Sequence, residues 1–97
     1  MDYQEHHTLH LRITLLRLLE AQPGYKANSS LLCDGSDAVG LTTTRDRVKT
    51  ELAWLAEQGL LRVQTLDNGL VVATLTERGL DVATGRVRVP GVKPPGP

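Results

Sequence analysis

The stretch of sequence that decides the fold spans residues 42–76 and reads TTTRDRVKTELAWLAEQGLLRVQTLDNGLVVATLT. In its first half Val48, Leu52 and Leu55 recur at i, i+4 and i+7, the spacing of one face of a helix. Gly59 follows where the positive φ angle that ends many helices favours glycine. The pattern predicts an amphipathic helix that ends before this glycine and turns a narrow apolar stripe toward a core.

A threonine and an acid indicate where this helix begins. Thr43 is the expected N-cap, because its hydroxyl oxygen can accept a backbone N–H of the first turn. Asp46, three residues later, has the spacing of a capping box, and its charge favours the positive end of the helix dipole. We therefore expect the helix to begin just after Thr43.

The second half of the stretch changes from a helical period to an alternating one. In LLRVQTL, residues 60–66, polar side chains alternate with apolar and β-branched ones, as in a strand with two different faces. Asp67-Asn68-Gly69 then predicts a tight hairpin, because Asn-Gly tolerates the positive φ angles of a type I′ turn. The return strand is expected over residues 70–74.

Three further helices are predicted around this stretch. A first helix over residues 6–22 ends at Pro23-Gly24, Asn28 caps a shorter one over residues 29–39, and Thr76 caps a last one that ends at Gly85. The short helix is expected to turn Leu31, Leu32, Ala38 and Val39 inward, and the last helix Leu80 and Ala83. The apolar face of the first helix is unusually broad, and it consists of Leu9, Leu11, Ile13, Leu15, Leu16, Leu18 and Leu19. Such a face needs cover on several sides, so a second copy of the chain, packed on the first helix, is an expected partner.

The composition predicts a folded domain followed by a C-terminal tail. Residues 1–85 are expected to form one small domain, since 97 residues suffice for one core. Residues 86–97, RVRVPGVKPPGP, hold four prolines and two glycines and are predicted to be flexible. This tail is also basic, because it contains Arg86, Arg88 and Lys93 and no acid.

Charge and cysteine content restrict the functional classes. Eleven basic and eleven acidic residues give a formal net charge of zero, which argues against strong nonspecific binding of nucleic acid. The chain has one cysteine, Cys33, and no signal peptide or long apolar run, so we expect a cytoplasmic protein with a buried thiol and no membrane contact.

No pattern of residues indicates catalysis or a metal. His6 and His10 have the i, i+4 spacing of a ligand pair, but nothing nearby completes a site, and a polar helix start explains them better. The sequence has no Ser-His-Asp order, phosphate-binding glycine loop or HExxH motif. We therefore expect no enzyme activity, no cofactor, no metal and no small-molecule ligand.

The predicted order of helix, helix, helix, strand, strand, helix describes a mainly α fold with a small antiparallel hairpin. It resembles the winged helix-turn-helix domains of bacterial regulators of the MarR, ArsR and PadR kind. Two segments, TRDRVKTELAWLAEQGLLRV and ATLTERGLDVATGRVRVPGV, are similar to small winged-helix-type proteins of Mu-like phages and prophages. They cover residues 44–63 and 73–92.

This resemblance implies that the helix after the turn enters the major groove of duplex DNA, while the hairpin wing approaches the backbone. The face is nevertheless mixed in charge, since Asp46 and Glu57 lie on it and the wing tip holds Asp67 but no Lys or Arg. The DNA-binding residues that the resemblance implies are Thr42, Thr43, Thr44, Arg45, Arg47, Lys49, Thr50, Arg86 and Arg88.

Two functional hypotheses follow. The first is a dimeric phage-type transcription regulator that binds DNA, and it predicts positive charge gathered at Arg45, Arg47, Lys49 and the tail. The second is a winged-helix module that binds another protein, and it predicts that these cations are paired with acids, as in an Arg47–Glu51 pair. Trp54, on the flank of the same helix, either packs inside the domain or marks a partner surface.

Overall fold

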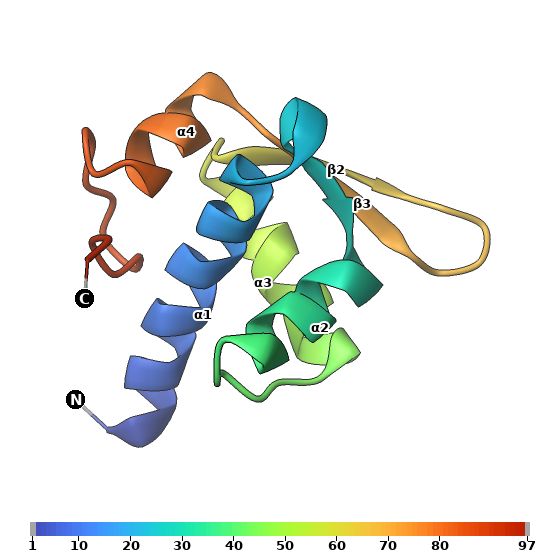
Figure 1. Ribbon diagram of the computed structural model, residues 1–97, viewed down its shortest axis with the longest axis horizontal. Helices are drawn as coiled ribbons and strands as arrows, with labels where there is room; N and C mark the ends of the chain where they lie inside the picture. The colour runs from blue at the N-terminus through green and yellow to red at the C-terminus, as the bar shows by residue number, and fades with distance from the viewer. Residues whose placement is uncertain (1, 97) are drawn as a thin grey trace.

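The computed structural model describes residues 2–96 and contains the predicted helices and strands in the predicted order, with one further short strand. Helix α1 (Tyr3–Glu20) crosses the molecule, with the other helices around it and the strands extending to one side as a wing (Figure 1). The remaining elements are a 3-10 turn (Pro23–Tyr25), β1 (Lys26–Asn28), α2 (Ser29–Ala38), α3 (Arg45–Glu57), β2 (Leu61–Thr65), β3 (Val71–Leu75) and α4 (Glu77–Ala83). The predicted fold class, a winged helix-turn-helix, is confirmed.

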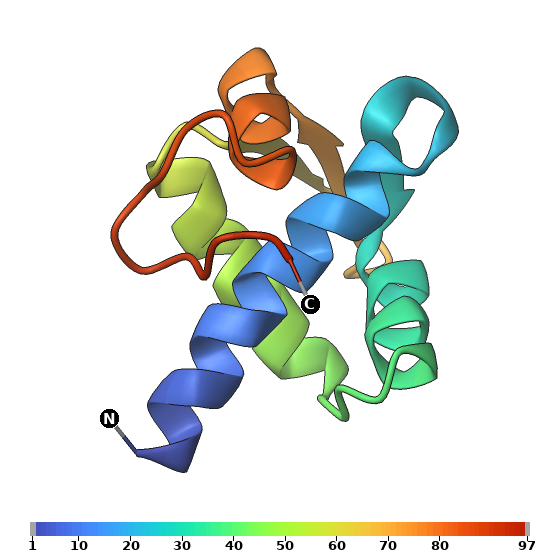
Figure 2. The same ribbon diagram turned by 60° about the vertical axis from the view of Figure 1, so that its left-hand side comes forward.

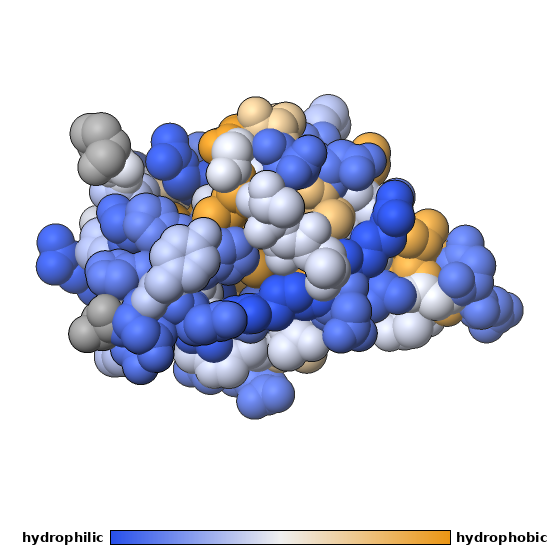
Figure 3. Space-filling model, turned by 90° about the horizontal axis from the view of Figure 1, so that it is seen from below, coloured by the Kyte–Doolittle hydropathy of each residue, from blue (hydrophilic) through white to orange (hydrophobic). Residues whose placement is uncertain are grey.

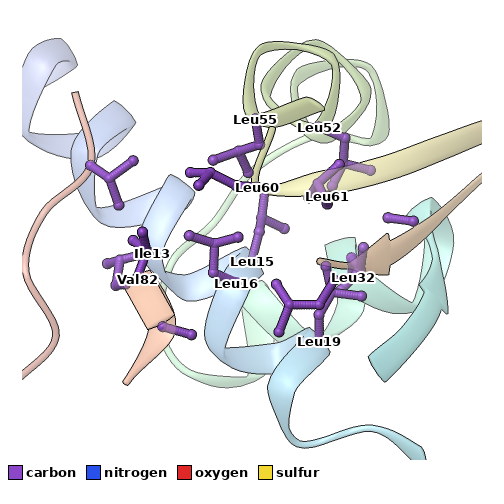
Figure 4. Packing of buried hydrophobic residues seen from close by; sticks show 14 of the residues in the cluster. Ile13, Leu15, Leu16, Leu19, Leu32, Leu52, Leu55, Leu60, Leu61 and Val82 are labelled. Atoms are coloured by element: carbon purple, nitrogen blue, oxygen red, sulfur yellow. The ribbon is translucent and has the colours of Figure 1, made fainter. Parts of the chain in front are cut away.

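Helix α1 begins three residues earlier than predicted. The carboxylate of Asp2 accepts the backbone N–H of Glu5 at 2.8 Å and caps the helix, so the polar start is helical. Its leucines are covered within one chain, because α1 packs against α2, α3, α4 and β3. In Figure 4 Leu15 and Leu16 point into the space between Leu60 and Leu32. The broad apolar face is thus no longer a reason to expect a second copy.

Helix α2 begins as predicted, but three of the side chains that were predicted to be buried are exposed. Asn28 caps it by accepting the N–H of Leu31 at 2.9 Å. Leu32 is buried, whereas Leu31 and Val39 are 59% and 65% exposed and Ala38 is also exposed, so the prediction that these three point inward is wrong. The reason is that α1 and α3 cover only one side of α2, the stripe that contains Leu32.

Helix α3 has the predicted apolar stripe, since Val48, Leu52 and Leu55 are fully buried. Its N-cap is Thr44, whose hydroxyl oxygen accepts the N–H of Arg47 at 3.0 Å, so the predicted cap at Thr43 and its capping box are wrong. Thr42, Thr43 and Thr44 all have a hydroxyl that could cap the helix. Which of them does so depends on contacts from other parts of the fold.

The helix ends at the predicted glycine. Gly59 has a φ angle of 76°, and the N–H of Leu60 returns to the carbonyl of Leu55 at 3.1 Å. The last helix, α4, is capped by Thr76, whose hydroxyl oxygen accepts the N–H of Gly79 at 3.0 Å. Val82 is buried there together with Ala83, while Leu80 is only half-buried.

The sheet contains one strand more than was predicted. Its order is β1-β3-β2, all antiparallel, and the unpredicted β1 has only three residues, too few for an alternating pattern. The hairpin turn also differs, because Gly69 has a positive φ angle (87°) and Asn68 does not. The carbonyl of Leu66 accepts the N–H of Gly69 at 2.9 Å, which indicates a type I turn followed by a left-handed glycine instead of a type I′ turn.

The tail, residues 86–96, packs against the domain. Val89 and Val92 are buried, and the N–H of Lys93 donates to the carbonyl of Leu9 at 3.4 Å. Figure 2 shows the tail passing over α3 and α1. The guanidinium of Arg12 holds it there by donating to the carbonyl of Gly91 at 2.9 Å. Its flexibility in solution stays a prediction.

Gly91→Ala tests this packing of the tail. A Cβ at residue 91 would stand 2.8 Å from the ring of Trp54, and the φ angle of 94° disfavours alanine. We expect the free energy of unfolding to fall by about 2 kcal/mol in urea denaturation. Gly96→Ala is the control, because a Cβ there meets nothing within 4 Å. Equal unfolding midpoints for the two variants would contradict the packed tail.

None of the helices in residues 2–96 combines the length and hydropathy that crossing a membrane requires.

Candidate nucleic-acid interface

The loop between α2 and α3 sets the position of the candidate DNA-binding helix. The N–H of Leu41 donates to the carbonyl of Ser36 at 2.9 Å, which closes the end of α2. The Nε2 of His7 lies 2.9 Å from the carbonyl oxygen of Thr42, so this ring nitrogen is the donor. The thiol of Cys33 lies 3.7 Å from the carbonyl oxygen of Thr43. Contacts from α1 and α2 therefore fix the start of α3.

The threonines of this segment differ in what their hydroxyls can reach. Thr42 and Thr44 are exposed, and the Thr44 hydroxyl serves as the helix cap. The Thr43 hydroxyl oxygen is buried and has no hydrogen-bond partner within residues 2–96, so it does not face a ligand on the surface. Thr50 is exposed one turn further on, and its hydroxyl donates to the carbonyl of Asp46 at 3.2 Å.

Arg47 is engaged inside the protein. Its Nε lies 2.9 Å from a carboxylate oxygen of Glu51, and its guanidinium also donates to the hydroxyl of Thr8. Glu51 is only 5% exposed and accepts a second arginine, since the Nε of Arg12 lies 2.7 Å from its other oxygen. The ion pair between Arg47 and Glu51, which the protein-binding hypothesis predicted, is thus present. Through Thr8, Arg47 also links α3 to α1.

Arg45 and Lys49 are placed differently. Neither has a carboxylate within 4.0 Å among residues 2–96. Arg45 is exposed, and its guanidinium lies 3.3 Å from the hydroxyl of Ser30. The ammonium of Lys49 reaches toward the wing, 3.9 Å from the point where a Cβ of residue 69 would stand. Arg45 is thus exposed at the start of α3, and Lys49 is half-buried one turn further on, beside the wing.

The two arginines of the tail are not part of this group. Arg86 and Arg88 are exposed on the segment after α4, which lies on the other side of α1 from α2 and the start of α3 (Figure 1). The N–H of Arg86 donates to the carbonyl of Asp81 at 2.8 Å, which keeps this segment close to α4.

The underside of the molecule, with the wing at one side, is mostly hydrophilic (Figure 3).

Comparison with known proteins relates the chain to phage Mu. No family model matches it. The uncharacterized protein gp26 of Escherichia phage Mu is 49% identical over 86 residues, which cover 89% of this chain and 88% of gp26. The chain belongs to the gp26 family. An uncharacterized protein of Haemophilus influenzae (strain Rd) is 43% identical over 84 residues, covering 87% of this chain and 81% of that protein. The resemblance to phage proteins is thereby confirmed.

A solved structure supports the fold of this gp26-family protein. A chain in the complex structure of hsRosR-S4 superposes with a TM-score of 0.61 at 19% identity. The match covers 74% of the gp26-family chain and 61% of that chain. At this identity the likeness shows the winged-helix fold and nothing about the role of the protein.

The sequence did not predict the role of Arg12, which links Glu51, Trp54 and the tail in this gp26-family protein. Arg12 lies between three groups, because it pairs with Glu51, donates to the tail and stands 3.7 Å from the centroid of the Trp54 ring. Trp54 therefore packs against α1 and the tail. One signal was available, since Glu51 stands three residues after Val48, on the edge of the apolar stripe. Within residues 2–96 no three His, Cys, Asp or Glu side chains are grouped as metal ligands.

Proposed function

We propose that this protein binds duplex DNA through the outward face of α3. The observation that carries the proposal is the pair Arg45 and Lys49, which lie on the helix after the turn, beside the wing, without an acidic partner within 4.0 Å in residues 2–96. Cations at these positions suit phosphate and base-edge contacts in the major groove. The exposed hydroxyl of Thr50 adds a polar group to the same face.

The proposal assigns a smaller interface than the resemblance implied. Arg47 is left out because Glu51 and Thr8 already bind its guanidinium. The wing tip holds Asp67 and no cation, so it offers no positive charge to a phosphate. With a net charge of zero and Asp46 on the same face, we expect weak, salt-sensitive binding to arbitrary sequences and a preference that comes from base contacts.

A role in transcription regulation is the further proposal that the fold supports by analogy. A homodimer through α1 stays part of this proposal, although Leu11, Ile13, Leu15, Leu16 and Leu19 are buried within a single chain and only Leu9 and Leu18 are half-buried.

Fluorescence anisotropy with a labelled duplex across a salt series tests the DNA proposal. We expect the slope of log K against log salt to become shallower by about 1.8 in Arg45→Ala/Lys49→Ala, because each phosphate that a cation neutralises adds about 0.9 to the slope. Arg17→Ala/Arg78→Ala is the matched control, since it removes the same charge from α1 and α4. Absence of binding at low salt, or equal slopes for the two variants, contradicts the proposal.

Two observations favour the second candidate, a module that binds another protein. Arg47 is paired with an acid, as that hypothesis predicts, and α2 presents Leu31 and Val39 to solvent. In this case the wild-type protein binds no duplex at low salt, and Leu31→Ser weakens binding to the protein partner without lowering the free energy of unfolding.

A further inference from the structure

The face of the sheet that points away from the helices carries a row of polar side chains. The antiparallel register aligns Lys26 of β1 with Thr74 of β3 and Arg62 of β2. Because side chains alternate along a strand, this row lies on the opposite face from Ala73, which is fully buried against the helices. We call this surface the outer sheet face, and its other residues are Asn28, Gln64 and Val72.

The outer sheet face is cationic. Lys26 and Arg62 are exposed, and neither has a carboxylate within 4.0 Å in residues 2–96. They line a shallow pocket of about 160 Å³ whose lining contains no acid, and the other lining residues are Val63, Gln64, Val72 and Thr74. In a chain with equal numbers of acids and bases, this is a local excess of positive charge.

The spacing of the row suits phosphate groups. Adjacent strands lie about 4.8 Å apart, so the Cα atoms of Lys26 and Arg62 are about 10 Å apart across β3. Their long side chains can therefore reach neighbouring phosphates of one strand, with the Thr74 hydroxyl between them. Lys, Arg, Thr and Gln are residue types that contact nucleic-acid backbones. The surface has no aromatic anchor of the kind that centres most protein interfaces.

We propose that the outer sheet face is a second contact surface for the phosphate backbone of nucleic acid, separate from α3. The proposal rests on the DNA binding proposed above. The opposite face of the sheet packs on the helices, so the row points away from α3 and touches a different segment of backbone. Contact there is independent of base sequence, because no base edge is read. The two surfaces together let one chain hold two backbone segments.

The experiment compares three double variants in the salt-series measurement. Lys26→Ala/Arg62→Ala is expected to make the slope shallower by about 1.8, as for Arg45→Ala/Lys49→Ala, while the control Arg17→Ala/Arg78→Ala leaves it unchanged. All six side chains are wholly or partly exposed, and circular dichroism verifies that each variant is folded.

The outcomes separate the two proposals. If only the α3 variant becomes shallower, DNA binding stands and the outer sheet face is not a contact surface. If only the outer-face variant becomes shallower, this surface is the binding site and the role of α3 is overturned. Absence of wild-type binding overturns both.

NMR titration of the Thr74 and Gln64 amides separates nucleic acid from other anions. The proposal predicts that the duplex shifts these resonances at concentrations where inorganic phosphate and an oligoglutamate peptide do not. Shifts produced by the peptide alone identify an acidic protein as the occupant and overturn the proposal.

Discussion

Gly79→Ala is expected to destabilise the protein more than any other glycine replacement in residues 2–96. Helix α4 lies so close to Leu60, in the segment between α3 and β2, that a Cβ at residue 79 would overlap the carbonyl oxygen of Leu60 and stand 2.7 Å from a methyl group of Leu75. The Leu60 carbonyl has little room to move, because it also accepts the N–H of Thr76 at 3.1 Å. We expect the free energy of unfolding to fall by about 3 kcal/mol or more.

Urea denaturation followed by circular dichroism measures this loss. Glu77→Ala is the control on the same helix, because Glu77 is exposed and loses only its interaction with the helix dipole, about 0.5 kcal/mol. For a domain of this size the larger loss lowers the melting temperature by well over 10 °C. A Gly79→Ala protein as stable as the control would show that α4 does not pack on Leu60 as described.

Glu51→Ala is expected to have the second large effect. It removes a carboxylate that is 5% exposed and leaves Arg12 and Arg47 without their shared partner. Removing one member of a buried ion pair costs about 3 kcal/mol, since the remaining charges stay poorly solvated. Partial exposure of both arginines places the expected loss at the lower end of the usual range.

Trp54 gives this prediction a second readout. Arg12 stands over its ring, so release of Arg12 from Glu51 is expected to change the fluorescence of the folded protein as well as the urea midpoint. Glu51→Gln keeps the shape and is expected to lose less stability than alanine. Glu57→Ala, on the exposed side of the same helix, is the control. Fluorescence and midpoints equal to those of the control would exclude the network as a source of stability.

The parts of the fold that were predicted correctly depend on local patterns. The buried stripe of Val48, Leu52 and Leu55 follows from helical spacing, and the caps at Asn28 and Thr76 follow from hydrogen bonds within four residues. Such features need no knowledge of the neighbouring elements, so periodicity and capping rules suffice.

The wrong predictions concern features that depend on contacts between residues far apart in the sequence. Thr44 replaces Thr43 as the cap in a loop that His7 and Cys33 contact from other helices. Leu31 points outward because of where α1 and α3 lie, and β1 exists only by pairing with β3. The packing of the tail, for which no prediction was made, likewise depends on a distant side chain, Arg12, which lies 79 residues away in the sequence.

The candidate site shows the same division. The sequence indicated the helix that carries Arg45 and Lys49, but it gave Arg47 equal standing with them. The difference is that Glu51 and Thr8 bind Arg47 in the folded protein, and Thr8 is 39 residues away. The cationic row of Lys26 and Arg62 was not predicted, because it depends on the register of an unpredicted strand.

The most direct test of DNA binding by α3 is an NMR titration of the ¹⁵N-labelled protein with a duplex at low salt. We expect the largest chemical-shift changes of the helices to fall on Arg45, Lys49 and Thr50 and to disappear at high salt. We expect little change at Arg86 and Arg88. No change in the α3 resonances at low salt, or changes confined to the tail, would contradict the central claim.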